Sequence, residues 1–304
     1  MRNYNGIKNK KEFKFNLWEV KESTTLLKWL IKYLGHSRTR IKATLHNRGI
    51  KVNNCIVTQF DYKLNIGDKV EVSTSKKKNE LKSKYLKIIY EDKFLVVVEK
   101  YSGILSMAAG HSTLNVKNVL DDYFVKSHHR CTAHVVHRLD RDTSGLMIYA
   151  KDIETEQILE HNWHNIVYDR RYIAVLSGEL NINNGTIANW LKDNKAFITY
   201  SSEINNGGKY AITHYCLLDK YQGHSLVEFK LETGRKNQIR VHAADLGFPV
   251  CGDIKYGNGD NPLGRLCLHA YILCFTHPIT KENLNFKTNI PRSFLSLFNQ
   301  KQIK

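Results

Sequence analysis

The sequence predicts an α+β protein, in which a large domain built on a mixed, mostly antiparallel sheet follows a small domain that begins with two helices. Residues 85–304 contain many short β-branched or aromatic runs separated by Gly, Asn and Asp, which is the pattern of strands and turns. Residues 14–74 instead begin with two helical patterns and end in short alternating segments. An apolar fraction of 42% excludes a disordered chain.

Four regions are expected along the chain. Residues 1–13 form a basic tail, 14–74 the small domain, 75–84 a Lys-rich linker and 85–304 the large domain. The boundary is placed at the linker because STSKKKNELKSK is polar and has no hydrophobic periodicity. A length of 304 residues is sufficient for two domains of roughly 100 to 200 residues each.

The positive charge is concentrated in the first quarter of the chain. The net charge is +17, and residues 1–84 contain 20 Lys or Arg against 7 Asp or Glu, a net charge of +13. The other 220 residues carry 26 against 22, a net charge of +4. Such a concentration of positive charge attracts phosphate backbones or an anionic membrane surface. A solvated charged face that aids solubility gives the same composition.

The two helices of the small domain are predicted from apolar spacing. In residues 26–34, LLKWLIKYL, the leucines and the isoleucine fall on one face, Thr24 or Ser23 can cap the start and Gly35 can end the helix. A second helix follows Ser37, with its buried positions at Ile41 and Leu45. Basic side chains lie on or beside its remaining surface.

A hairpin and a further strand complete the small domain. Residues 50–57 turn at Asn53-Asn54, because Asn tolerates the positive φ that a tight turn requires. Residues 64–72, LNIGDKVEV, add a turn and an alternating strand. Two helices and a short twisted sheet with basic side chains on the second helix form a surface suited to a nucleic-acid backbone.

Residues 17–74 resemble the alpha-L RNA-binding motif, a small domain that also occurs in a ribosomal protein, some tRNA synthetases and several RNA-modifying enzymes. The resemblance is carried by LLKWLIKYLGHSRTRIKATLHNRGIKVNNCIV and LNIGDKVEV. It implies RNA binding by shape and phosphate contact, through Arg38, Arg40, Lys42 and Lys51.

In the large domain, a loop between two strands carries a candidate catalytic carboxylate. HRLDRDTSG, residues 137–145, crowds charged residues between two apolar strands, and Gly145 permits a turn that a bulkier residue does not make cheaply. Asp140 is expected to stay ionised beside Arg138 and Arg141, as a nucleophile or base requires. An Asp that caps its own loop produces the same local pattern.

Two helices are expected in this domain, at about residues 152–167 and 238–246. The second begins in TGRKNQIRVH, where Arg235 and Arg240 flank Gln238. Guanidinium groups there can point at a carboxylate or a phosphate. Alone, such a string is more typical of an exposed helix start.

The large domain resembles the RluA family of pseudouridine synthases over about residues 87–290. The resemblance is carried, in order, by HRLDRDTSG, RRYIAVLSG, GKYAITHY, TGRKNQIRVH and RLCLHAYILCFTHP. It implies the pseudouridine synthase fold and the isomerisation of uridine in RNA, most readily in large-subunit ribosomal RNA, with tRNA as the alternative substrate. A non-catalytic RNA-binding or ribosome-assembly factor that keeps the fold is the alternative from another class.

The same resemblance implies roles for particular side chains. Asp140 matches the family's catalytic aspartate, and Arg138 the neighbour that helps take the place of the extruded base. Tyr172 matches the tyrosine that packs on the uracil ring, Arg240 the arginine that pairs with the aspartate, and Leu268 an apolar pocket residue.

Cofactors, metals and protein partners are not expected. The reaction involves neither redox nor group transfer, so it needs no cofactor or metal. His128, His129, Cys131, His134 and His137 are dense enough to suggest zinc, but no second cluster has ligand spacing. No apolar run approaches the roughly 20 residues of a membrane span, and the six scattered cysteines include no CxxC pair. We therefore expect a cytoplasmic monomer whose partner is RNA.

Overall fold

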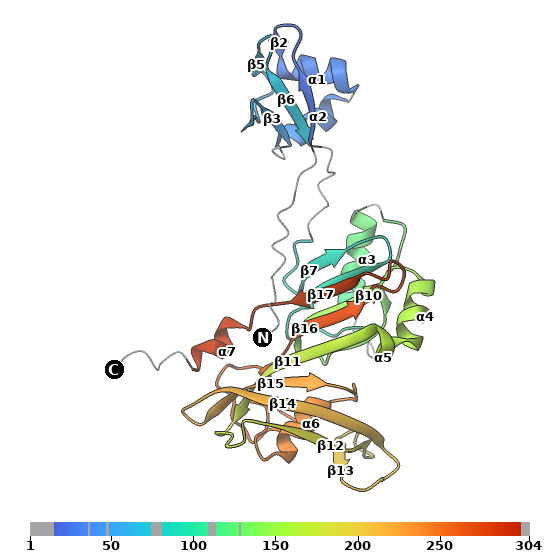
Figure 1. The fold of residues 1–304 in the computed structure, drawn as a ribbon, viewed down its shortest axis with the longest axis vertical. Coiled ribbons are helices and arrows are strands. Elements are labelled where there is room, and N and C mark those ends of the chain that lie inside the picture. The colour runs from blue at the N-terminus through green and yellow to red at the C-terminus, as the bar shows by residue number, and fades with distance from the viewer. Residues whose placement is uncertain are drawn as a thin grey trace, which may run out of the picture. The chain divides into compact units, whose positions relative to one another are not determined.

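The computed structural model describes residues 15–35, 37–46, 49–73, 81–108, 114–127 and 129–298. The chain divides into two compact units, residues 1–80 and 81–304, which are drawn in Figure 1. The basic tail predicted for residues 1–13 lies outside the described residues, as do residues 74–80 around and within the predicted linker. No helix in the described part of the chain is long and apolar enough to cross a membrane.

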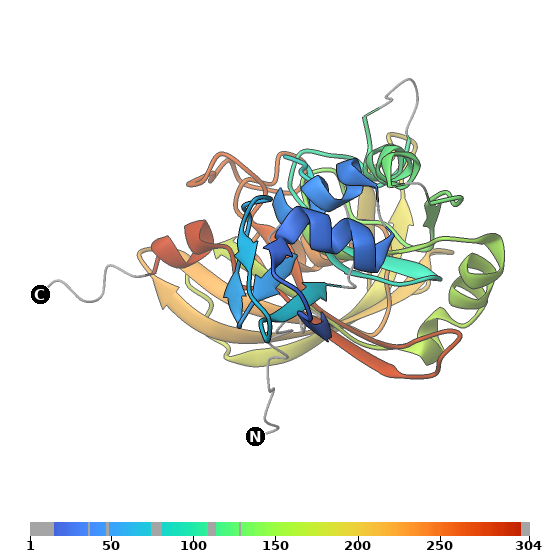
Figure 2. The ribbon, with the colours of Figure 1, turned by 90° about the horizontal axis from the view of Figure 1, so that it is seen from above.

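The first unit, unit 1, combines two helices with short antiparallel strands (Figures 1 and 2). Its elements are β1 (Phe15–Glu19), β2 (Thr24–Thr25), α1 (Leu26–Leu34), α2 (Arg38–His46), β3 (Ile50–Val52), β4 (Cys55–Ile56), β5 (Lys63–Leu64) and β6 (Lys69–Ser73). Four strands form one sheet in the order β1-β6-β3-β4, and β2 pairs with β5.

The local signals of unit 1 explain its elements. Gly35 ends α1 in the left-handed conformation, with φ 61° and its N–H donating to the carbonyl of Ile31. The cap prediction is wrong by one residue, because Thr25 occupies the N-cap position and its side chain makes no capping hydrogen bond. The predicted hairpin is confirmed, since β3 pairs with β4 and Asn53 and Asn54 have φ 49° and 66°.

The second unit, unit 2, is organised around one large sheet. Its strands are β7 (Leu86–Glu91), β8 (Leu95–Lys100), β9 (His134–Val135), β10 (Ser144–Ala150), β11 (Val167–Ser177), β12 (Asn184–Asp193), β13 (Thr199–Ser202), β14 (Lys209–Tyr221), β15 (His224–Leu231), β16 (Leu268–Thr276) and β17 (Asn283–Lys287). Its helices are α3 (Val116–Lys126), α4 (Ile153–His161), α5 (Trp163–Ile166), α6 (Gln238–Asp245) and α7 (Arg292–Ser296).

The sheet of unit 2 contains 11 strands and is mostly antiparallel, as the sequence predicts. Nine strands follow the order β13-β12-β14-β15-β11-β16-β10-β8-β7, while β17 pairs with β16 and β9 with β10. The exception is the parallel pair β10–β16, with Ser144 opposite His269 and Gly145 opposite Ala270. The central strands β10 and β16 are almost wholly buried, which agrees with their continuous apolar sequences.

The helix predicted over residues 152–167 is instead two helices. α4 ends at His161, and the Asn162 side chain donates to the carbonyl of Ile158, while Asn162 also precedes α5. A side-chain hydrogen bond to the last turn competes with continuation of the helix. The apolar periodicity runs across this break because Leu159 of α4 and Trp163 and Ile166 of α5 pack into the same hydrophobic cluster.

Candidate active site

Asp140 lies in the loop between β9 and β10, and the backbone of this loop is hydrogen-bonded by side chains of β8 and of the segment that follows β8. Ser106 Oγ donates to the carbonyl of Leu139 at 2.7 Å, and the Leu139 N–H donates back to Ser106 Oγ at 3.1 Å. The buried side-chain nitrogen of Lys100 donates to the carbonyls of Arg141 and Ile104, both at 2.8 Å. The backbone on both sides of Asp140 is therefore fixed before any ligand binds.

Gly145 brings β10 close to β16 at the end of this loop. Its φ is +123°, and a Cβ added there would lie 2.2 Å from the carbonyl oxygen of Ala270. The glycine is thus required by a close approach of two backbones. That approach places the Asp140 loop beside Leu268, the first residue of β16.

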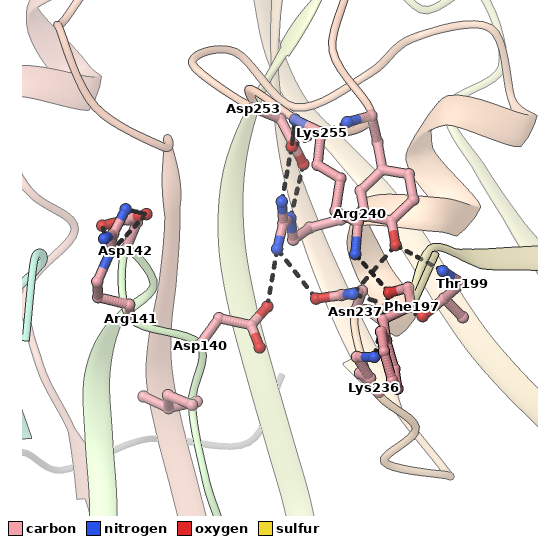
Figure 3. Close-up of polar contacts among 12 residues, drawn as sticks. Asp140, Arg141, Asp142, Phe197, Thr199, Lys236, Asn237, Arg240, Asp253 and Lys255 are labelled. Carbon is pink, nitrogen blue, oxygen red and sulfur yellow. Dashed lines mark hydrogen bonds and ion pairs between the residues drawn. The ribbon is translucent and has the colours of Figure 1, made fainter. Parts of the chain in front are cut away.

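The Asp140 carboxylate is bonded to a guanidinium from a distant segment (Figure 3). Arg240 Nη1, on α6, donates to Asp140 Oδ2 at 3.1 Å and to Asn237 Oδ1 at 2.9 Å. The opposite side of the guanidinium binds the fully buried Asp253 carboxylate through two bonds of 2.7 Å. Arg240 is therefore fixed in a planar network that orients the Asp140 carboxylate.

Arg240 and Asp253 stabilise each other's charged forms. Burial lowers the pKa of Arg240, but the hydrogen bonds and charge of Asp253, with a smaller contribution from Asp140, raise it above its ordinary value. Burial raises the pKa of Asp253, but Arg240 and the backbone N–H groups of Lys255 and Tyr256 lower it overall. Both groups stay charged at neutral pH.

A cavity of about 640 Å³ opens around Asp140. Its lining includes all five residues that the sequence analysis assigns to the active site: Arg138, Asp140, Tyr172, Arg240 and Leu268. They come from the Asp140 loop, β11, α6 and β16. The cavity is large enough for a nucleotide-sized ligand.

Tyr172 and Leu268 reach the cavity from adjacent strands in the middle of the sheet. β11 and β16 are antiparallel, with Tyr172 opposite Ala270 and Ala174 opposite Leu268. Burial raises the pKa of Tyr172, which Arg170 lowers and Asp140 raises. The phenol is therefore protonated at neutral pH, and its ring is an apolar surface with one polar end.

Three lining residues, His137, Trp163 and Arg170, form a wall that the sequence analysis did not assign to the site. The His137 and Trp163 ring centroids are 4.7 Å apart, and the Arg170 guanidinium carbon is 5.9 Å from the Trp163 ring centroid. His137 Nε2 accepts the Ile148 N–H at 2.9 Å, and burial together with the charge of Arg170 lowers its pKa to about 3. His137 is therefore neutral. The sequence signal for this wall was Trp163 itself, an aromatic beside the motif strands.

The expected arginine neighbours of Asp140 differ from those observed. Arg141 is bonded to Asp142, with Nε–Oδ1 at 3.2 Å, and Arg138 is exposed at the cavity lining. Neither forms an ion pair with Asp140, whose partner is Arg240. Adjacent residues in an extended loop point in different directions, so sequence proximity did not select the ion pair.

The histidine and cysteine cluster suggested by residues 128–137 does not converge on one point in the described part of the chain. His129 contacts Lys151 and Glu91, His134 bonds to Glu156 at 2.9 Å and His137 accepts the N–H of Ile148. His128 lies outside the described residues. A different group, His224, Cys251 and Asp260, has its ligand atoms within 4.8 Å of one another, and none of these residues lines the cavity.

The four residues expected to bind RNA lie in unit 1, at α2 and β3. Arg38 and Lys42 on α2 are exposed. Lys51 on β3 is half-buried and lies 3.8 Å from a carboxylate oxygen of Glu71. Arg40 is on α2, and its side chain lies outside the described residues.

Residues 94–245 match the family described as RNA pseudouridylate synthase. The chain is 36% identical over 213 residues to an uncharacterized RNA pseudouridine synthase, YjbO, of Bacillus subtilis, covering 70% of this chain and 75% of YjbO. It is 32% identical to ribosomal large subunit pseudouridine synthase D of Buchnera aphidicola, covering 86% and 88% of the two chains. Human RNA pseudouridylate synthase domain containing 1 has a similar structure, with TM-score 0.58, 26% identity and coverage of 70% and 86%.

Proposed function

This chain belongs to the RNA pseudouridylate synthase family and is an isomerase, and from that membership we propose that it converts specific uridines of large-subunit ribosomal RNA to pseudouridine. The choice of RNA is supported by relatives named ribosomal large subunit pseudouridine synthase D, which match across 84% to 87% of this chain. The basic excess of residues 1–84 fits a large folded RNA. Transfer RNA is the second candidate substrate.

The observation that carries the proposal is the oriented carboxylate of Asp140 at the wall of a nucleotide-sized cavity. In the reaction, the bond between ribose C1′ and uracil N1 breaks, the free base turns, and a bond forms between C1′ and C5. The proton on C5 is lost and N1 gains one, so the atoms balance without a further reactant. Asp140 either attacks C1′ or removes a ribose proton, and Arg240 holds its carboxylate in place.

The other lining residues retain the base while it is detached. Tyr172 lines the cavity, which supports a role in which its ring packs against uracil and its hydroxyl helps to move the C5 proton. Leu268 supplies apolar contact that helps to keep the detached base in the cavity. Arg138, exposed at the lining, takes the place that the extruded uridine leaves in the RNA.

The direct test is pseudouridine formation on in vitro transcribed large-subunit ribosomal RNA. Asp140→Asn removes the charge without changing the size of the side chain, so we expect a rate loss of at least about 100-fold. Asp142→Asn is the matched control, since it lies in the same loop but pairs with Arg141. A wild-type protein that binds this RNA tightly and forms no pseudouridine in it, in tRNA or in total RNA would support a non-catalytic RNA-binding factor instead. Mapping pseudouridine in total RNA from cells that lack the protein identifies the substrate.

We also propose that unit 1 is an alpha-L domain that anchors the enzyme on RNA, and that the chain acts as a cytoplasmic monomer. Arg38 and Lys42 are on the exposed surface of α2, where phosphates are accessible to them. Arg38→Gln with Lys42→Gln should weaken RNA binding and reduce the slope of log K against log salt concentration by roughly one to two units. Lys28→Gln with Lys63→Gln, two exposed lysines on α1 and β5, is the equal-charge control. Equal slopes in the two double variants would show that Arg38 and Lys42 do not form the RNA-binding surface.

A further inference from the structure

Two guanidinium groups that line the active-site cavity have no acidic partner in the part of the chain that the structure describes. Arg170 on β11 and Arg235 before α6 both line the cavity. Among the residues that the structure describes, neither forms an ion pair, and their hydrogen bonds go to the backbone carbonyls of Glu232 and Tyr210. Arg240, in contrast, is bonded to two carboxylates.

The backbone between these arginines leaves space for them. A Cβ added to Gly234 would lie 2.8 Å from Arg170 Nη1, so this guanidinium lies directly against the glycine backbone. Burial lowers the pKa of Arg170, Tyr172 raises it in part, and the positive charge of Arg235 lowers it, which means that the two cations repel each other. Unpaired cations that are partly removed from water are unfavourable unless an anion joins them.

A second cavity extends the positive surface beyond this point. It has a volume of about 340 Å³ and shares Gly234, Arg235 and Lys236 with the first. Its lining adds Lys192 and Lys209. The only acidic residue among those lining it, Asp193, is bonded to Lys236 at 2.7 Å. An anionic chain that leaves the first cavity can therefore continue along cations.

We propose that Arg170 and Arg235, beside Gly234, bind the phosphodiester group next to the uridine that occupies the cavity. This inference rests on the proposed function, because it concerns how the same site holds an RNA nucleotide. Guanidinium groups bind phosphate oxygens through two parallel hydrogen bonds, and the phosphate removes the repulsion between the two arginines. The second cavity then receives the backbone of the following nucleotide.

The test compares two small probes, uridine and uridine 3′,5′-bisphosphate, by isothermal titration calorimetry on the full chain. Wild-type protein should bind the bisphosphate at least tenfold more tightly, which corresponds to 1.4 kcal/mol. Arg170→Gln and Arg235→Gln should each reduce this ratio by about fivefold or more. Arg292→Gln, an exposed arginine on α7 outside both cavities, should leave it within about twofold.

Arg170→Lys separates charge from packing, because it keeps a cation but loses the planar contact with Trp163. It should retain more of the phosphate gain than Arg170→Gln does. If Arg170→Gln does not fold, Arg235→Gln carries the test alone. The inference is overturned if wild-type protein binds both probes equally, or if both glutamine variants keep the full ratio. Binding is measured without turnover, so an inactive protein still tests the contact, and an active protein with unchanged ratios rejects only this inference.

Discussion

Arg240→Gln is expected to destabilise unit 2 strongly, because the arginine is the charged partner of a fully buried carboxylate. The Asp253 side chain has 0% exposure and binds Arg240 through two bonds of 2.7 Å. Its remaining bonds come from the backbone N–H groups of Lys255 and Tyr256. Removing one partner of a buried ion pair costs about 3 to 5 kcal/mol. For a unit of this size, that corresponds to a fall in Tm of about 6 to 20 °C.

The assay is thermal and urea unfolding of the full chain followed by circular dichroism, with Asp253→Asn and the double variant as controls. The double variant should be more stable than the two single effects added together predict, because it contains no unpaired buried charge. Pseudouridine formation should stay low in Arg240→Gln and in the double variant, since both lose the group that orients Asp140.

The destabilisation should also depend on pH in a defined direction. In the wild-type protein the pKa of Asp253 is lowered, so its ion pair stabilises the fold at pH values above the unfolded pKa of about 3.9 and is lost as pH falls through the lower folded value. In Arg240→Gln only the backbone N–H groups of Lys255 and Tyr256 still offset the burial of Asp253, so we expect its folded pKa to rise above that of the unfolded chain. The deficit relative to wild type therefore shrinks between pH 7 and pH 5. An unfolding free energy within about 1 kcal/mol of wild type at pH 7 would refute the reasoning.

Three further predictions follow from the site. Gly145→Ala should lower the unfolding free energy by about 2 to 6 kcal/mol, because it adds positive-φ strain and an overlap with Ala270. Gly223→Ala, with φ +75° and no atom within 4 Å of its added Cβ, measures the strain alone. Equal losses of unfolding free energy in the two variants would contradict the close approach of Gly145 to Ala270. His137→Asn should remove a pH dependence of the unfolding free energy, because the folded pKa of His137 is about 3 and its unfolded pKa is about 6.5. As the pH falls from 7 to 5, wild type should therefore lose about 1 to 2 kcal/mol of unfolding free energy relative to the variant. Parallel plots of unfolding free energy against pH, measured by urea unfolding, would rule this out. Tyr172→Phe should slow pseudouridine formation at least about 100-fold with unchanged RNA affinity if the hydroxyl moves the C5 proton, and a rate within twofold in single-turnover assays would leave only the ring as the functional part.

Local sequence determined the elements that depend on short-range patterns. The Asn53-Asn54 hairpin, the Gly35 helix end and the alternating or apolar strands of unit 2 were all predictable from neighbouring residues. The strands β12 and β13 were not singled out, because most of their side chains are polar or exposed. The helix α3 was also not singled out, although its buried residues Val116, Leu120, Tyr123 and Phe124 have helical spacing. The position of Asp140 in a loop between β9 and β10 also followed from local pattern.

The sequence by itself, through its motif strings, determined the family and the residues expected around the uridine, but only the tertiary structure decided which charges meet. Arg141 is adjacent to Asp140 and pairs with Asp142, while Arg240, one hundred residues away, bonds to Asp140 at 3.1 Å. The wall of His137, Trp163 and Arg170 likewise comes from separate segments that meet at one cavity only in the folded unit. The physical reason is that side-chain direction along a loop is set by backbone geometry, and distant partners are selected by sheet register and burial rather than by spacing in the chain.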